Sequence, residues 1–373
     1  MTMIEKSDRL IALDAFRGLT IATMILVNTP GSWSNVYAPL LHASWHGFTP
    51  TDLVFPFFLF AVGAAMSFSL RKYEGRSSEA VKKILKRTAL IFLIGIFLNI
   101  FPGYHFIRGE FVDFSTLRIM GVLQRIALAY GVGALICYFL DTRKVVIVSS
   151  LVLLGYWLVM GILGSGDPYS LEGNAALKLD LLIIGADHLY KGFGIPFDPE
   201  GLLSTLPAVV NVTIGFLAGS FVRAESNKEQ LISRFFLFGN GLIFFALCWD
   251  MVFPINKPIW TSSYVLMSSG IALVILSFLV YVLDIKRQKS WARPLLVFGM
   301  NPLAIYVLSG VWVDLYFQIP AGEGQTAYGW IYENIFVPIG GKLNGSLLFA
   351  LAHVTFYWFF GWLLYRKNIV IKI

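Results

Sequence analysis

The sequence has few charged residues and almost no cysteine. Only 14% of its 373 residues are Asp, Glu, Lys or Arg, whereas a soluble globular chain carries about 25%. This deficit excludes an ordinary soluble globular protein, because too little polar surface is available to cover the fold in water. The two cysteines, Cys137 and Cys248, lie in apolar runs. They predict neither a disulfide framework nor a metal site.

What the sequence has instead is a series of long apolar runs. Hydrophobic residues make up 57% of the chain, and the mean hydropathy is +0.71. A membrane-spanning helix needs roughly 20 mostly apolar residues, so the runs predict an all-α, polytopic transmembrane helix bundle with about ten spans. Residues 1–373 are expected to form a single integral membrane domain. The predicted spans are 11–28, 51–70, 84–101, 117–140, 145–163, 203–222, 235–252, 264–283, 295–317 and 345–365.

The distribution of Lys and Arg supports this count and predicts an orientation. Loops on the same side as the two termini would contain 21 of the 29 basic residues, and the opposite loops would contain five. Because cytoplasmic loops are enriched in Lys and Arg, we predict that both termini are cytoplasmic, with a bacterial inner membrane as the expected location. The net charge of +7 then marks the cytoplasmic leaflet of a membrane lipid bilayer. No nucleic-acid partner is expected.

Charged side chains inside predicted spans are the first candidates for function, because a charge at the bilayer centre costs roughly 2.5–3.5 kcal/mol on insertion scales. Asp14 and Arg17 are three residues apart on one face of the first span. They would form either a local ion pair or part of a ligand site.

The fourth predicted span contains two more such candidates. Arg118 and Arg125 are seven residues apart and would share a helical face, with Gln124 beside it. Arg125 lies too deep to reach water easily and requires an acid, a carbonyl or an anionic ligand. Its partner would be a structural acid (Asp250, Asp314 or Asp14) or a substrate.

The segment 27–63, between the first two spans, has the densest cluster of polar side chains. Asn28 ends the first span, His42 lies in the outer loop, and Asp52 opens the second span. Asp52 could simply cap that helix, because a carboxylate complements the helix dipole there. The alternative is a catalytic site in which His42 acts as a base, Asp52 orients the imidazole, and Asn28 donates to a developing oxyanion.

Six stretches distributed over nearly the whole chain carry a family resemblance. They are LDAFRGLTIATMILVN at 13–28, HASWHGFTPTDLVFPFFLFAVG at 42–63, LQRIALAY at 123–130, DPEGLLSTLPAVVNVTIGFLAG at 198–219, NKPIWTSSYVL at 256–266 and NPLAIYVLSG at 301–310. Together they resemble the heparan-alpha-glucosaminide N-acetyltransferase family of membrane acetyltransferases, of which this chain looks like a bacterial-type homologue.

The resemblance implies an enzyme that transfers an acetyl group from cytoplasmic acetyl-CoA to an amine across the membrane, typically that of a glucosamine. The family's active histidine falls on His42, its partner carboxylate on Asp52, and its asparagine near the end of the first span on Asn28. The expected partners are therefore acetyl-CoA, an amino-sugar acceptor and membrane lipid, with no metal. The composition is compatible with a homodimer but does not argue for one.

Donor and acceptor would then lie on opposite sides of the membrane. Basic side chains of the inner face, or of the 284–294 loop, would hold the CoA phosphates, and the pantetheine arm would pass Gln124 and Arg125. His42 would either accept the acetyl group or deprotonate the incoming amine. The predicted acetyl-CoA-binding residues are Arg17, Lys83, Arg87, Arg118, Gln124 and Arg125.

Two alternatives from other functional classes stay open on the sequence alone. A transporter or flippase for a sugar or glycolipid would use Arg118 and Arg125 to line a substrate path. An O-acyltransferase of envelope glycans would use the same donor with a hydroxyl acceptor. Acetyl-CoA dependence separates the first alternative from the acetyltransferase, and comparison of amine with hydroxyl acceptors separates the second.

Overall fold

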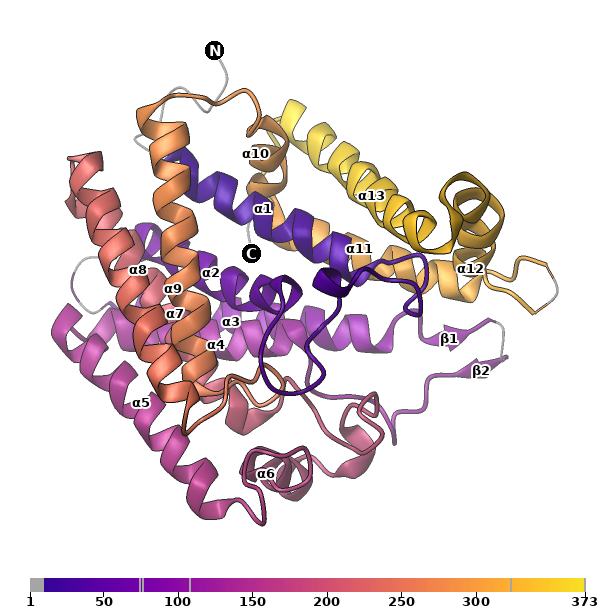
Figure 1. The fold of residues 1–373 in the computed structure, drawn as a ribbon, viewed down its shortest axis with the longest axis horizontal. Coiled ribbons are helices and arrows are strands. Elements are labelled where there is room, and N and C mark those ends of the chain that lie inside the picture. Colours follow the sequence, from indigo (N-terminus) through magenta and orange to yellow (C-terminus); the bar gives the residue numbers. More distant parts are fainter. Residues whose placement is uncertain (1–9, 74, 76, 107–108, 323, 372–373) are drawn as a thin grey trace.

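Helices form along almost every apolar stretch of the sequence, and they pack into an all-α membrane bundle, as predicted (Figure 1). The computed structural model describes residues 10–73, 75, 77–106, 109–322 and 324–371. Part of the predicted orientation depends on Lys6, Arg9, Arg76, Arg108 and Lys372, which lie outside the described residues.

The α-helices follow the predicted order. Their bounds are α1 Ile11–Asn28, α2 Val54–Leu70, α3 Ser78–Ile100, α4 Val122–Phe139, α5 Thr142–Leu163, α6 Ala175–Ile183, α7 Leu202–Ala224, α8 Lys228–Asp250, α9 Ser262–Leu279, α10 Arg293–Met300, α11 Pro302–Gln318, α12 Ala327–Ile331 and α13 Val337–Arg366. Short 3-10 turns occur at η2 Ala38–Leu40, η3 Pro50–Leu53 and η4 Ala186–His188, and π-helical turns at η5 Val280–Ile285 and η6 Tyr332–Phe336. Strands β1 Tyr104–His105 and β2 Glu110–Phe111 pair antiparallel, with Tyr104 opposite Phe111.

The number of spans is close to the predicted ten but differs at two places. Within the described residues, eight helices are long and apolar enough to cross a membrane, or up to nine if the bent pair α10–α11 is one span. The predicted span 295–317 is bent by 83° between these two helices, because the ring of Pro302 removes a backbone donor and restricts Asn301. The predicted span 84–101 lies in α3. This helix carries the charged side chains of Lys83, Lys86 and Arg87 and is not among the eight.

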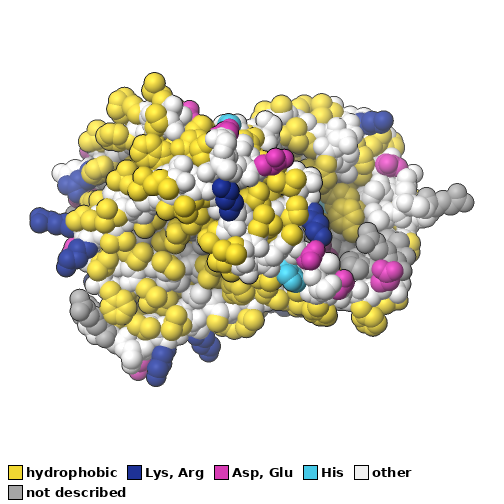
Figure 2. All heavy atoms as spheres, turned by 90° about the horizontal axis from the view of Figure 1, so that it is seen from below, with side chains coloured by type: hydrophobic (Ala, Val, Ile, Leu, Met, Phe, Trp, Pro, Cys, Tyr) yellow, Lys and Arg dark blue, Asp and Glu magenta, His cyan; other side chains and the backbone are white. Residues whose placement is uncertain are grey.

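Helices of the bundle divide into buried and peripheral ones. The backbones of α2 and α7 approach so closely that a Cβ atom at Gly63 would lie 1.9 Å from the carbonyl oxygen of Val212, which is the close packing that small residues allow in membranes. In contrast, α5 and α8 expose apolar side chains, as expected of lipid-facing helices. On α5 these are Val146, Ile147, Leu151, Leu154, Leu158, Ile162 and Leu163. Figure 2, a view of the molecule from below Figure 1, shows hydrophobic side chains over much of that face, with charged side chains scattered among them.

Two helices, α2 and α9, connect opposite ends of the molecule. Asp52 precedes α2 and Arg71 follows it; Lys257 precedes α9, and Lys289 follows its π-helical continuation η5. In Figure 1 the loop before α9 lies at the bottom of the view and the loop after it at the top. The 17 residues of α2 make it about 25 Å long, close to the roughly 30 Å of a hydrocarbon core.

Candidate active site and basic cavity

The Asp52 carboxylate is held at the entrance to α2 by several donors. Its Oδ2 accepts from the backbone N–H of Thr49 at 2.9 Å, from the Thr49 hydroxyl at 3.1 Å and from the backbone N–H of Ala43 at 3.0 Å. These contacts include the capping box of the η3 turn. The predicted capping role of Asp52 is therefore confirmed, and it leaves Oδ1 for a different partner.

That partner is His42, whose Nδ1 lies 2.6 Å from Asp52 Oδ1. A carboxylate can only accept a hydrogen bond, so we assign the proton to Nδ1, which leaves a lone pair on Nε2. The His42 side chain is 45% exposed, whereas that of Asp52 is 2% exposed. A buried carboxylate that orients an accessible imidazole is suited to a general base or a nucleophile.

Lys257 is the residue of this site that sequence reasoning missed. Its Nζ lies 3.0 Å from His42 Nδ1 and 3.3 Å from Asp52 Oδ1, and its side chain is 17% exposed. Burial lowers the pKa of Lys257, although the charges of Asp52 and Glu200 oppose this shift. The available signal was that Lys257 is one of only five basic residues in the predicted outer loops and lies within the conspicuous stretch 256–266.

The two loops that carry this site are docked against each other. The backbone N–H of Gly47 donates to the carbonyl of Ile255 at 2.7 Å, and the Tyr264 hydroxyl of α9 donates to the Asp52 carbonyl. Asn256 supports the second loop by accepting from the Ile259 N–H at 2.9 Å. The first two contacts join segments more than 200 residues apart, so the position of Lys257 depends on tertiary packing.

Asn28, the third predicted catalytic residue, is not joined to this site. It is the last residue of α1 and is exposed. Within the described part of the chain, the hydrogen bonds of the His42 and Asp52 side chains come from other residues. Hydrogen bonds thus join two of the three predicted catalytic residues, and the role of Asn28 stays a prediction.

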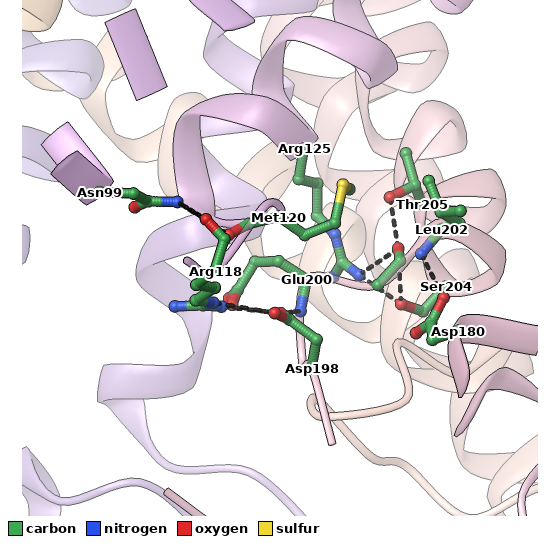
Figure 3. Close-up of polar contacts among 11 residues, drawn as sticks. Asn99, Arg118, Met120, Arg125, Asp180, Asp198, Glu200, Leu202, Ser204 and Thr205 are labelled. Atoms are coloured by element: carbon green, nitrogen blue, oxygen red, sulfur yellow. Dashed lines mark hydrogen bonds and ion pairs between the residues drawn. The ribbon is translucent and has the colours of Figure 1, made fainter. Parts of the chain in front are cut away.

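The predicted helical face shared by Arg118 and Arg125 is wrong, because α4 begins only at Val122. The preceding backbone has partners elsewhere: the Asn99 amide donates to the carbonyls of Arg118 and Met120. Arg118 itself forms a bidentate pair with Asp198 at 2.7 and 2.8 Å (Figure 3).

Glu200 completes the surroundings of Arg118, with a carboxylate oxygen 2.6 Å from the guanidinium. Burial by itself would lower the pKa of Arg118, but Asp198 and Glu200 more than offset burial and raise it. An arginine with two acidic partners has little capacity left for a phosphate. Its predicted role in acetyl-CoA binding is therefore not supported by its contacts.

Arg125 is fully buried and meets a carbonyl, one of the three kinds of partner that the sequence allowed, whereas the proposed acids Asp250, Asp314 and Asp14 form no ion pair with it among the described residues. It donates to the Gly201 carbonyl at 3.2 Å and to the Ser204 hydroxyl (Figure 3), and its guanidinium lies 4.8 Å from the centre of the Trp260 ring. Among the described residues, its Nε and Nη1 atoms have no hydrogen-bond partner, and neither does Nε2 of the buried Gln124. Both side chains therefore keep donors for a polar group inside the bundle.

A buried carboxyl group, Asp180 of α6, lies near Arg125. Its Oδ1 accepts from the backbone N–H of Leu202 at 2.9 Å, whereas Oδ2 has no hydrogen-bond partner in the part of the chain that the structure describes. A Cβ atom at Gly201 would lie 1.8 Å from that oxygen, so a larger residue there would displace the Asp180 carboxyl. Burial raises the pKa of Asp180 to about 7, although the Leu202 N–H opposes the shift.

A cavity of about 1430 Å³ lies at the other end of α2 and α9. Several cationic and aromatic side chains face it, the combination that suits a phosphorylated ligand with an aromatic base. Two carboxylates also line the cavity: Glu225 is paired with Arg234 at 3.1 Å, and Asp284 accepts from the N-terminal N–H groups of α1. The basic lining residues are Arg71, Arg223, Lys228, Lys289 and Arg293, and the aromatic ones are Phe68, Trp358, Trp362 and Tyr365.

The inner-face residues predicted to bind acetyl-CoA lie outside the lining of this cavity. Arg17 is 3.5 Å from Asp14, so the predicted local ion pair is present. Lys83 donates to the Tyr73 hydroxyl at 3.1 Å, and Arg87 lies over the ring of Tyr130. In contrast, the alternative 284–294 loop contributes two basic residues to the cavity.

Comparison with known proteins gives one consistent family. Residues 9–233 match the family described as "Heparan-alpha-glucosaminide N-acetyltransferase, catalytic". The chain is similar to heparan-alpha-glucosaminide N-acetyltransferase of Homo sapiens, with 30% identity over 98% of this chain and 60% of the relative. It is also similar to the protein of that name from Mus musculus, with 29% identity over 90% and 58%. The chain thus spans about three fifths of the length of these relatives.

Proposed function

The chain belongs to the catalytic family of heparan-alpha-glucosaminide N-acetyltransferases, and from this premise we propose that it transfers an acetyl group from acetyl-CoA to the amine of a glucosamine-type sugar. The observation that carries the proposal is the 2.6 Å contact between His42 Nδ1 and the buried Asp52 carboxylate. This contact leaves Nε2 of an accessible imidazole for a substrate, which acyl transfer to an amine requires.

His42 and Asp52 would perform the proton chemistry. The amine nitrogen forms a bond to the acetyl carbon while the thioester C–S bond breaks. The proton lost by the amine passes to His42 Nε2 and from there to the departing thiolate. In an alternative route Nε2 attacks the acetyl carbon and the C–S bond breaks, releasing the CoA thiolate. The amine then attacks this acetyl group, the bond to Nε2 breaks, and the amine proton passes to the thiolate. In both routes Asp52 holds the imidazole in one tautomer, and Asn28 is a candidate donor to the oxyanion.

The basic cavity is the better candidate for the nucleotide end of acetyl-CoA than the residues that the sequence predicted. Its arginines and lysines suit the CoA phosphates, and Trp358 and Trp362 offer aromatic faces to the adenine. The pantetheine arm would then cross the bundle along α2 and α9. On this path the unpartnered donors of Gln124 and Arg125 would meet its amide carbonyls.

The proposed topology places the cavity in the cytoplasm and His42 on the opposite side. The basic loops around Arg71, Lys228 and Lys289 favour the cytoplasmic side by the positive-inside tendency, and both termini would share it. We place the protein in a bacterial inner membrane, with residues 1–373 as one domain. Labelling of single cysteines in the loops of intact cells, with a membrane-impermeant reagent, tests this orientation.

The experiment that tests the function is transfer of labelled acetyl from acetyl-CoA to glucosamine by purified protein in detergent. Wild type is compared with His42→Ala, and His46→Ala is the matched control. His46 lies in the same loop, but it contacts the Asn256 amide at 3.4 Å and the ring of Trp45. We expect transfer by wild type and His46→Ala and at least a 100-fold loss in His42→Ala.

Other outcomes would change the role of His42 or the proposed function. Equal transfer by wild type and His42→Ala would remove His42 from the chemistry. Transfer to a hydroxyl sugar in place of the amine would identify an O-acyltransferase. Acetyl-CoA-independent movement of a sugar across proteoliposomes, without acetylation, would identify a transporter.

A further inference from the structure

Lys257 has no part in the proposed mechanism, yet it is the cation that contacts both of its central side chains. Its Nζ lies 3.3 Å from Asp52 Oδ1 and 3.0 Å from His42 Nδ1. Because Nδ1–H already donates to Oδ1, the hydrogen bond from Lys257 goes to the same carboxylate oxygen. Two donors of different charge thus converge on Oδ1.

The arrangement also balances the charge of a buried carboxylate. The Asp52 side chain is 2% exposed, and a buried carboxylate without a cation is strongly destabilising. Without Lys257, the positive charge that could compensate Asp52 would have to come from a protonated His42. A protonated ring has no lone pair on Nε2 and can neither accept a proton nor attack an acetyl group.

We propose that Lys257 is a positioning residue of acetyl transfer, whose ammonium neutralises Asp52 so that His42 stays an uncharged, correctly oriented base. The inference rests on the proposed function, because it assigns Lys257 to that reaction. Lys257 forms no bond to substrate; it acts through the Asp52 carboxylate. Its role is therefore separable from those of His42 and of the distant acetyl-CoA cavity.

The surroundings of Lys257 make this role dependent on pH. The acidic groups of Asp52 and Glu200 favour the ammonium form, whereas Arg125 and burial disfavour it, and burial dominates. The His42 imidazole also contacts the Lys257 side chain, at 3.0 Å. Because the pKa of Lys257 lies below 10.5, the ordinary value for lysine, its ammonium loses the proton at a lower pH than an exposed lysine does. Activity should fall as the pH rises through that deprotonation.

The test compares Lys257→Met, Lys257→Arg and the control Lys191→Met, which alters an exposed lysine of the 184–201 loop. For Lys257→Met we expect kcat to fall roughly 10- to 100-fold, with KM for acetyl-CoA changed less than about twofold. Lys257→Arg should retain much of the activity and move the alkaline limb of the pH–rate profile upward, because a guanidinium stays charged. Lys191→Met should match wild type.

Three outcomes would overturn the inference. They are a Lys257→Met protein with wild-type kcat and alkaline limb, a Lys257→Arg profile identical to that of wild type, or an equal loss in Lys191→Met. If Lys257→Met does not fold, as shown by gel filtration and thermal unfolding, the Lys257→Arg profile decides. If the wild-type protein shows no acetyl transfer, the proposed function itself is wrong, and this inference fails with it.

Discussion

Charged side chains are arranged differently at the two ends of α2 and α9. At one end Asp52 is 2% exposed and accepts from five donors, which belong to His42, Ala43, Thr49 and Lys257. At the other end the basic side chains surround a cavity of about 1430 Å³. The first arrangement fixes one imidazole in one orientation, and the second offers positive charge over a broad area.

This difference indicates a division of labour. Proton transfer needs reacting atoms held within a few tenths of an ångström, whereas binding of an anionic nucleotide needs mainly favourable charge and shape. Substitutions at the enclosed site should therefore lower kcat, and substitutions in the cavity should raise KM for acetyl-CoA. The following predictions test this contrast.

The largest effect is expected at Asp52. Asp52→Asn keeps one oxygen for the capping contacts but removes the charge that orients His42, so kcat should fall roughly 10²- to 10⁴-fold with little change in KM for acetyl-CoA. Steady-state kinetics check this, with Asp187→Asn as the control at an exposed carboxylate. A loss below about threefold would show that Asp52 only caps α2.

A smaller effect, on stability, is expected at Asp180, which is buried like Asp52 but accepts one hydrogen bond. Its pKa is raised from 3.8 to about 7, so between these values the folded state binds more protons than the unfolded state. The free energy of unfolding should therefore decrease as the pH rises through that window, by on the order of 2 kcal/mol between pH 5 and pH 7.

Thermal unfolding of wild type and Asp180→Asn at several pH values measures this contribution. The asparagine variant should lose most of the pH dependence, because its amide cannot ionise, and Asp187→Asn should keep it. Equal pH dependence in wild type and Asp180→Asn would show that the Asp180 carboxyl is not the group responsible.

A moderate effect on binding is expected in the cavity. Arg293→Gln or Arg71→Gln removes one charge that faces the proposed nucleotide site, so KM for acetyl-CoA should rise about 3- to 10-fold with kcat nearly unchanged. The rise should shrink at high ionic strength. Lys144→Gln is the control, since Lys144 pairs with Asp141 on the surface; an equal effect there would remove the cavity from the proposal.

The smallest effect is expected at Lys83, which the sequence nominated for acetyl-CoA and which lies outside the cavity lining. Lys83→Gln loses a contact with the Tyr73 hydroxyl at 3.1 Å. It should change KM for acetyl-CoA by less than about twofold, as surface substitutions usually do. A rise as large as that of Arg293→Gln would restore Lys83 as a phosphate ligand.

Sequence reasoning succeeded where short-range patterns decide the outcome. The first two spans fit α1 and α2 closely, because apolar run length sets the length of a membrane helix. His42 and Asp52 are ten residues apart and approach to 2.6 Å, and one loop with a capped helix entrance suffices for that. Reasoning failed at Arg118, where seven-residue spacing indicated a helix but Asn99 and Asp198 hold the chain outside it.

The sequence by itself determined the membrane bundle, the approximate spans and the His42–Asp52 pair. These depend on apolar periodicity and on contacts within one loop, both of which can be read from neighbouring residues. Only the tertiary structure decided that Lys257, 215 residues from His42, completes the pair and that separate helix ends form one basic cavity. The physical reason is that these charged side chains pair across helices. Such pairing depends on how the helices pack rather than on the spacing of the residues along the chain.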